Sequence, residues 1–215
     1  SVLLDQEDKL CLAYMPLPMH MRVMDVSILI AAVVAQYARL SGEHGKKRIA
    51  QRLTNYVVSQ QTDYGAWYYT DPPGDSPIRH DNYHTGFILD ALWRYMEASD
   101  DWQWKSAYEK GLRFYADELF NPDGSPRWMS HKDFPHDVHG AAQGLITFSL
   151  AMGNGYPYAT LLERIGSWAT RILYCEEGRF YYQQCRWGKK RFTLMRWCNA
   201  WMFKALAAMY EAQNQ

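Results

Sequence analysis

Apolar segments recur at nearly equal intervals along this chain, and this spacing constrains the fold more than any other feature. The segments begin at Asp25, Asn82, Asp137 and Arg196, which are 57, 55 and 59 residues apart. Glycines in the aromatic connections between them repeat with a similar period, at Gly65, Gly124 and Gly178. Two sets of markers with one period indicate an internal structural repeat.

Each repeat predicts a pair of helices. The recurring segment is apolar almost all round, as in a buried helix, and the next segment has apolar residues at helical spacing with charges between them. The helices are expected over 25–40, 46–61, 82–98, 101–120, 137–152, 158–173 and 196–211. Stacked αα-hairpins place the buried helices inside and the amphipathic helices outside. We therefore predict an all-α fold in one domain (1–215): an α/α toroid or partial toroid with short β elements in its long loops.

Seven helices are too few to close such a ring. Residues 8–24 carry two prolines and some alternation, so they predict a short strand and an ordered loop, with no outer helix before the first buried one. We expect the ring to be completed by an upstream segment or by another subunit.

Composition excludes some classes of function. Lys and Arg balance Asp and Glu at 23 each, so no global field recruits nucleic acid. No apolar run approaches the ~18 residues that a membrane-spanning helix needs, so no membrane span is expected. The four cysteines, Cys11, Cys175, Cys185 and Cys198, have no CxxC spacing. A Cys175–Cys185 pair across a hairpin is one alternative, but reduced thiols and a cytoplasmic location are the expectation.

Aromatic residues are abundant, with 9 Trp, 16 Tyr and 8 Phe. Most are expected to fill gaps between helices, and the others to line a cavity that takes sugar rings. The long connections all precede buried helices, so the site is expected where those helices begin. Candidate rim residues on the connections are Trp67, Tyr68 and Trp128.

A polar column recurs two residues into each buried helix: Ser27, His84, His139 and Cys198. A helix N-terminus disfavours imidazolium, so such a histidine stays neutral and able to accept a proton. The alternative is a histidine that ties down its neighbouring loop. Two residues before this column the chain holds Asp25, Asn82 and Asp137, which are good helix caps. The catalytic candidates are His84, His139, Asp81 and Asp137.

Further polar residues near these helix starts are candidates for substrate binding. The planar guanidinium of Arg79 or Arg196 suits a carboxylate. Gln143, one turn after His139, suggests a wet lumen. The full set is Arg79, His80, Asn82, Tyr83, Gln143, Arg196 and Asn199. We expect no metal, because His80 precedes the helix that carries His84, and we expect no cofactor.

The motif Gln61-x2-Tyr64-Gly65-Ala66-Trp67 resembles the aromatic turn of terpenoid-cyclase-like toroids. The blocks that begin at His84, Asp137 and Arg196 resemble bacterial polysaccharide-biosynthesis proteins of the VpsJ type, over residues 8–212. This resemblance implies a role in exopolysaccharide or cell-surface glycan assembly, with a glycan or glycan precursor as partner. The chain lacks the Asp-x-Asp-Asp motif of squalene-hopene cyclases, so isoprenoid cyclisation is not expected. A lyase- or epimerase-like enzyme on an acidic glycan is the first hypothesis. The alternatives are a hydrolase that uses Asp81 and Asp137, or a non-catalytic toroid that binds glycan or a partner.

Overall fold

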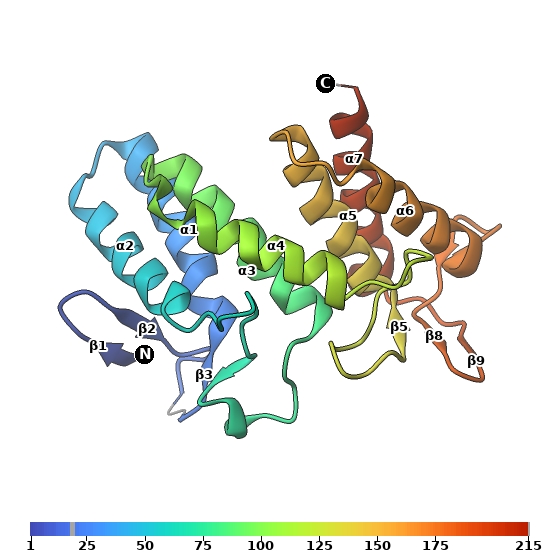
Figure 1. The fold of residues 1–215 in the computed structure, drawn as a ribbon, viewed down its shortest axis with the longest axis horizontal. Coiled ribbons are helices and arrows are strands. Elements are labelled where there is room, and N and C mark those ends of the chain that lie inside the picture. Colours follow the sequence, from blue (N-terminus) through green and yellow to red (C-terminus); the bar gives the residue numbers. More distant parts are fainter. Residues whose placement is uncertain (18–19, 215) are drawn as a thin grey trace. The chain divides into compact units, whose positions relative to one another are not determined.

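The chain is mainly helical in a computed structural model that describes residues 1–17 and 20–214. The described residues form seven α-helices (Figure 1): α1 Met24–Ser41, α2 Gly45–Val58, α3 Asn82–Ser99, α4 Lys105–Glu118, α5 Val138–Gly153, α6 Ala159–Leu173 and α7 Trp201–Gln213. The expected all-α fold of αα-hairpins is thus confirmed. Every expected helix is present within a few residues of its predicted bounds, except that the fourth and last predicted helices begin with turns of another kind.

Those two helices begin with tighter or wider turns. A 3₁₀ turn, Trp102–Trp104, precedes α4, and a π-helix, Met195–Ala200, precedes α7. The helix predicted from Arg196 is therefore regular only from Trp201. Single π-turns occur frequently at functional sites.

Short strands occupy the connections. They are β1 Val2–Asp5, β2 Leu10–Leu12, β3 Arg22–Val23, β4 Thr70–Asp71, β5 His136–Asp137, β6 Tyr174–Cys175, β7 Arg179–Phe180, β8 Gln183–Cys185 and β9 Gly188–Lys190. They pair antiparallel as β1–β2, β3–β4, β6–β7 and β5–β8–β9. The predicted strand near residue 10 is β2, and of the loop predicted to follow it, Pro18 and Met19 lie outside the described residues.

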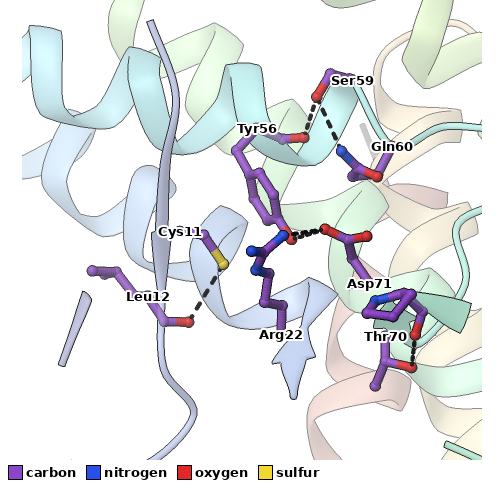
Figure 2. A network of polar contacts seen from close by, with 9 residues as sticks. Cys11, Leu12, Arg22, Tyr56, Ser59, Gln60, Thr70 and Asp71 are labelled. Carbon is purple, nitrogen blue, oxygen red and sulfur yellow. Dashed lines mark hydrogen bonds and ion pairs between the residues drawn. The ribbon is translucent and has the colours of Figure 1, made fainter. Parts of the chain in front are cut away.

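The chain divides into two compact units, one of residues 1–80 and 87–114 and one of residues 81–86 and 115–215. In the first unit α1 packs along α2. A polar network fixes the strands beside α2 (Figure 2): the Asp71 carboxylate accepts hydrogen bonds from Arg22 and from the Tyr56 hydroxyl, each at 3.0 Å. Burial raises the pKa of Tyr56 and of the Cys11 thiol, so both stay protonated. The single domain expected over 1–215 stays a prediction.

In the second unit α5 packs against both α6 and α7, and nearly every α5 side chain is buried. This is the predicted buried helix. Its core includes Leu145, Ile146 and Phe148.

The predicted turn glycines all adopt positive φ angles, +96° at Gly65, +89° at Gly124 and +78° at Gly178. A Cβ on Gly65 would lie 2.5 Å from the Lys110 carbonyl oxygen in α4, and one on Gly124 would lie 2.3 Å from the Arg164 carbonyl carbon in α6. Each of these turns therefore sits on the backbone of the following outer helix. Gly178 has no such neighbour within 4 Å among the described residues.

Two helices predicted to be buried are only half covered. Leu29, Val33 and Leu40 of α1 are exposed, and so are Phe203 and Tyr210 of α7. An apolar sequence does not determine which side a neighbour covers, so the expectation of full burial is wrong for α1 and α7. Completion of the ring by more chain or another subunit stays a prediction.

Helix α1 also corrects the premise that no segment has the length and apolarity of a membrane span. Its 18 residues have a mean hydropathy of 1.3 and are 44% buried. Asp25 and Arg39 interrupt the apolar run, but the helix is still apolar enough on average to cross a membrane. The core helix of a soluble protein can be equally long and apolar, so this observation is weak evidence for a membrane span.

Candidate active site at the start of α3

Asp81 and His84 form a hydrogen-bonded pair at the N-terminus of α3. The Asp81 Oδ2 atom accepts from the His84 backbone N–H at 3.3 Å and lies 2.7 Å from Nδ1 of the His84 ring. A neutral imidazole in this contact carries its proton on Nδ1 and its lone pair on Nε2. Asp81 is buried, whereas the His84 side chain is 18% exposed. The pair therefore joins a buried carboxylate to a histidine whose side chain is partly accessible.

The ring of Tyr83 joins His84 to the second histidine of the column. Its centroid lies 4.4 Å from the His84 ring and 5.0 Å from the His139 ring, with which it stacks at 13°. Trp201 stacks on His139 at 4.4 Å and 28°, and Trp197 meets it edge-on at 4.3 Å. His139 is therefore packed among three aromatic rings.

This packing separates the chemistry of the two histidines. His139 is 2% exposed, and burial, together with the charges of His84 and Lys204, lowers its pKa to about 3. It stays neutral, as expected for a helix N-terminus. Its burial leaves no surface for a substrate, so the role of base expected for His84 or His139 suits His84.

Asp137 caps α5 and fixes the aromatic cluster. Its carboxylate accepts from the His139 backbone N–H at 2.8 Å, from Trp197 Nε1 at 2.9 Å and from Gln183 Nε2 at 2.6 Å. The expected cap is confirmed. Burial raises the pKa of Asp137, and these hydrogen bonds oppose that effect. With three donors bound and 3% exposure, Asp137 is placed to hold the site together rather than to meet a ligand.

Asn82 does not cap α3, and this corrects the expectation. Asp81 takes the capping position, while Asn82 donates from Nδ2 to the Leu119 carbonyl oxygen at 2.7 Å and accepts from the Tyr115 hydroxyl at 3.1 Å. It is 2% exposed. The Asp81-Asn82 sequence offers two good caps, and the chain uses the first.

The first residue of α1 also departs from the expectation. The helix begins at Met24, with Val23 before it, so Asp25 lies in its first turn and is not its cap.

Gln143 is sealed in the core, which contradicts the expectation of a wet lumen. It is 1% exposed and donates from Nε2 to Thr147 Oγ1 at 3.0 Å. A Cβ on Gly86 would lie 2.4 Å from Gln143 Cγ, so the start of α3 and α5 approach closely here.

The π-helix before α7 carries the remaining candidates of this unit. Arg196 is exposed. Asn199 Oδ1 accepts from the Phe180 backbone N–H at 3.0 Å and so fixes a loop. Trp128 lies on the connection of residues 119–135, between α4 and β5, and its ring centroid is 6.3 Å from that of Tyr83. Trp197, Trp201 and Gln183 were not among the predicted site residues. The sequence does offer one signal for them: Trp197 directly precedes Cys198, the residue of the polar column in the last repeat.

The predicted site residues of the other unit form a separate cluster. His80 is buried, with Nδ1 3.1 Å from the Trp67 carbonyl oxygen and Nε2 3.1 Å from the Tyr64 hydroxyl. The Tyr68 ring lies 4.2 Å from it. Trp67 is a core residue, 2% exposed, whose indole donates to the Val57 carbonyl oxygen, so it does not rim a cleft. Arg79 is exposed.

The first and last residues of the polar column, Ser27 and Cys198, accept hydrogen bonds from the backbone. Ser27 Oγ accepts from the Leu12 backbone N–H at 3.1 Å, and Cys198 Sγ accepts from the Leu194 backbone N–H at 3.3 Å. Both are fully buried. Of the four column residues, His84 alone is partly exposed.

No protein-family profile and no curated protein matches the chain. The resemblance to VpsJ-type proteins therefore stays a prediction.

Solved structures do resemble it. A glycosyl hydrolase family 88 protein from Bacteroides vulgatus aligns with 89% of the chain at a TM-score of 0.65 and 13% identity. A polysaccharide lyase aligns with 94% at 0.65 and 14%, and the cellobiose 2-epimerase from Bacillus thermoamylovorans aligns with 89% at 0.66 and 10%.

The chain covers 62%, 64% and 59% of those three proteins, so it spans less than two thirds of their length. At such low identity the likeness concerns the fold and not the residues of the site. The chain therefore has the αα-hairpin fold of the α/α-toroid enzymes.

Proposed function

We propose that this chain is a carbohydrate-active enzyme that removes a proton from an acidic glycan, with His84 as the base and Asp81 as its positioning residue. The observation that carries this proposal is the 2.7 Å contact between Asp81 Oδ2 and His84 Nδ1. A carboxylate that holds one ring nitrogen fixes the tautomer and orientation of the imidazole, and it stabilises the imidazolium that forms when Nε2 takes a proton.

The reaction is of the lyase or epimerase type. His84 Nε2 takes the proton from the carbon next to the substrate carboxylate, and the electron pair moves into that carboxylate. In a lyase the bond to the leaving sugar oxygen then breaks, a C=C bond forms, and the Tyr83 hydroxyl protonates the leaving oxygen. In an epimerase the carbon takes a proton back on its opposite face. Arg196 is the exposed candidate of this unit that neutralises the carboxylate, since the polar candidates Asn82 and Gln143 are buried.

A hydrolase is less well supported. It needs two carboxylates that flank the scissile bond, one of them able to protonate the leaving oxygen. Asp81 is engaged with His84 and Asp137 with three donors, and both are buried.

The proposed setting is bacterial exopolysaccharide or cell-surface glycan biosynthesis in the cytoplasm. The resemblance of the His84, Asp137 and Arg196 blocks to VpsJ-type proteins supports the pathway. All four cysteines are free thiols, which fits a reducing compartment.

The test is an assay of acidic polysaccharides (polygalacturonate, alginate and heparin) in D₂O. NMR reports exchange of the proton next to the carboxylate, and ultraviolet absorbance reports the unsaturated lyase product. We expect His84→Ala to reduce the rate about 10²–10⁴-fold, the contribution of a positioned general base. His131→Ala, which removes an exposed histidine of the same unit, is the matched control and should leave the rate unchanged.

A folded His84→Ala protein with the full rate would refute the role of His84. Tight binding of an acidic glycan by the wild type without exchange or elimination would support the alternative of a non-catalytic binding protein.

A further inference from the structure

The balanced net charge of the chain conceals a strongly basic segment. Residues 178–210 contain seven cationic side chains: Arg179, Arg186, Lys189, Lys190, Arg191, Arg196 and Lys204. All 23 acidic residues of the chain lie outside this segment. Among the described residues, its ion pair is the contact of Arg179 with Glu177 at 2.8 Å. Most of this positive charge therefore faces solvent without a compensating carboxylate.

The charge is concentrated on the β8–β9 hairpin, which also carries an exposed indole. Every residue from Arg186 to Phe192 is exposed. Trp187, in the two-residue turn, is 93% exposed, and the Arg186 guanidinium lies 6.0 Å from its ring centroid. A tryptophan exposed to this extent next to uncompensated cations is typical of a binding surface.

Hydrogen bonds connect the hairpin to the candidate active site. Lys190 Nζ donates to Gln183 Oε1 at 2.8 Å, and Gln183 donates to Asp137 at 2.6 Å. Asp137 caps α5, whose second residue is His139. The register Gln183↔Lys190 and the pairing of β8 with β5 make this connection part of one three-stranded sheet.

A second connection runs through α7. Lys204 Nζ lies 4.9 Å from the Trp201 ring centroid, and Trp201 stacks on His139. The field of Lys204 reaches the His139 ring, since it helps to lower the pKa of that residue. Lys190 and Lys204 thus connect the basic segment to the aromatic cluster, while Arg186 lies in the turn of the hairpin and Arg191 follows its last strand.

We propose that the β8–β9 hairpin is a binding surface for a polyanionic glycan and guides the chain of sugars to the site at His84. Arg186 and Arg191 bind carboxylate or sulfate groups, and the Trp187 indole stacks on the apolar C–H face of a pyranose. Cations at the turn and at the base of the hairpin, with an exposed indole at the turn, match a ligand that carries both negative charges and sugar rings. The connection with Asp137 and His139 favours a glycan over a nucleic acid or a lipid surface, which would need no path to this site. The inference rests on the proposed function for its destination, but the binding itself is tested separately.

The experiment measures binding of size-defined oligogalacturonate to the full chain by calorimetry at two salt concentrations. The variant Arg186→Gln/Trp187→Ala/Arg191→Gln changes exposed side chains only, so the fold is retained. We expect it to lose about tenfold or more in affinity, because several exposed charge contacts and one stacked ring are removed. Wild-type binding should weaken at high salt, because exposed charges are screened.

The matched control is Lys46→Gln/Lys47→Gln, which removes two exposed cations from α2 in the other unit. It should bind within about twofold of the wild type, since single exposed charges away from the ligand contribute little. His84→Ala should bind the oligosaccharide as the wild type does. If His84→Ala also retains turnover, the proposed function fails while the binding surface stands.

Three results would overturn the inference. The first is unchanged oligogalacturonate affinity in the hairpin variant. The second is equal affinity for a neutral dextran oligosaccharide, which would show that charge is not recognised. The third is hairpin-dependent binding to phosphatidylserine vesicles or to DNA with none to oligogalacturonate, which would assign the surface to a membrane or to nucleic acid.

Discussion

Substituting alanine for the turn glycines tests how the repeats are held together. Gly124 and Gly178 occupy the same position of consecutive repeats, with φ angles of +89° and +78°. An alanine in this left-handed region costs about 1–2 kcal/mol at either site. The backbone term is therefore nearly common to both substitutions, and the difference between them isolates packing.

Packing differs sharply between the two sites. A Cβ at position 124 would lie 2.3 Å from the Arg164 carbonyl carbon, 2.4 Å from its oxygen and 2.6 Å from the Ile165 nitrogen. Carbon atoms in contact prefer about 3.5–4.0 Å, and these are backbone atoms of α6 that cannot rotate away. Overpacking of this kind costs about 1–3 kcal/mol. We expect Gly124→Ala to lower the free energy of unfolding by about 2–5 kcal/mol and Gly178→Ala by about 1–2 kcal/mol.

Urea unfolding followed by far-ultraviolet circular dichroism measures both values from the midpoint and slope. Gly65→Ala repeats the test in the other unit, where the Cβ would lie 2.5 Å from the Lys110 carbonyl oxygen. It should resemble Gly124→Ala. Equal destabilisation by Gly124→Ala and Gly178→Ala would refute the view that these turns are seated on the following outer helix.

Two further predictions concern the buried polar residues of the site. His139 has a pKa of about 3 in the folded chain, against about 6.5 when unfolded. The unfolded chain therefore binds the proton first, so the stability due to neutral His139 is complete above pH 6.5 and is lost as pH falls towards 3. Between pH 7 and pH 5 this amounts to about 2 kcal/mol, and urea titrations should show that slope in the wild type but not in His139→Gln; equal slopes would contradict it. Asn82→Ala removes one donor from the Leu119 carbonyl oxygen, which keeps the Arg127 backbone N–H, and an acceptor from the Tyr115 hydroxyl. Thermal unfolding should therefore show a loss of about 1–3 kcal/mol, and an unchanged free energy of unfolding would contradict the burial argument.

Sequence periodicity predicts the helices of this chain well because burial imposes it. A helix such as α5 must be apolar on every side that a neighbour covers. The amphipathic helices α2, α4 and α6 must carry apolar residues on one face and polar residues on the other. The period of the turn glycines also has a direct cause in Gly65 and Gly124, which fit against an outer helix where no side chain fits. The same pattern does not show whether a neighbour covers an apolar face, and for this reason α1 and α7 were expected to be fully buried and are only half covered.

The polar candidates were harder to predict, because the type of a residue does not determine which way its side chain points or which partner it binds. Asp81 and Asn82 are adjacent and equally good caps, and only the backbone path decides that Asp81 binds the His84 amide while Asn82 turns to Leu119. Gln143 lies one turn after His139, and this spacing suggested a water-filled lumen. Instead, Gly86 has no side chain and lets the start of α3 pack directly against Gln143. In both cases a neighbouring element decides, and that element is far away in the sequence.

The difference between the two column histidines does have a sequence signal, which becomes clear once the repeats are superposed on the structure. Trp197 and Trp201, which cover His139, lie one and five residues after the start of the fourth repeat at Arg196. The same positions of the third repeat, counted from Asp137, hold Val138 and Ala142. Neither side chain is large enough to cover an imidazole as an indole does. His84 therefore stays partly accessible while His139 is buried, and this difference in exposure is what makes His84 the proposed base.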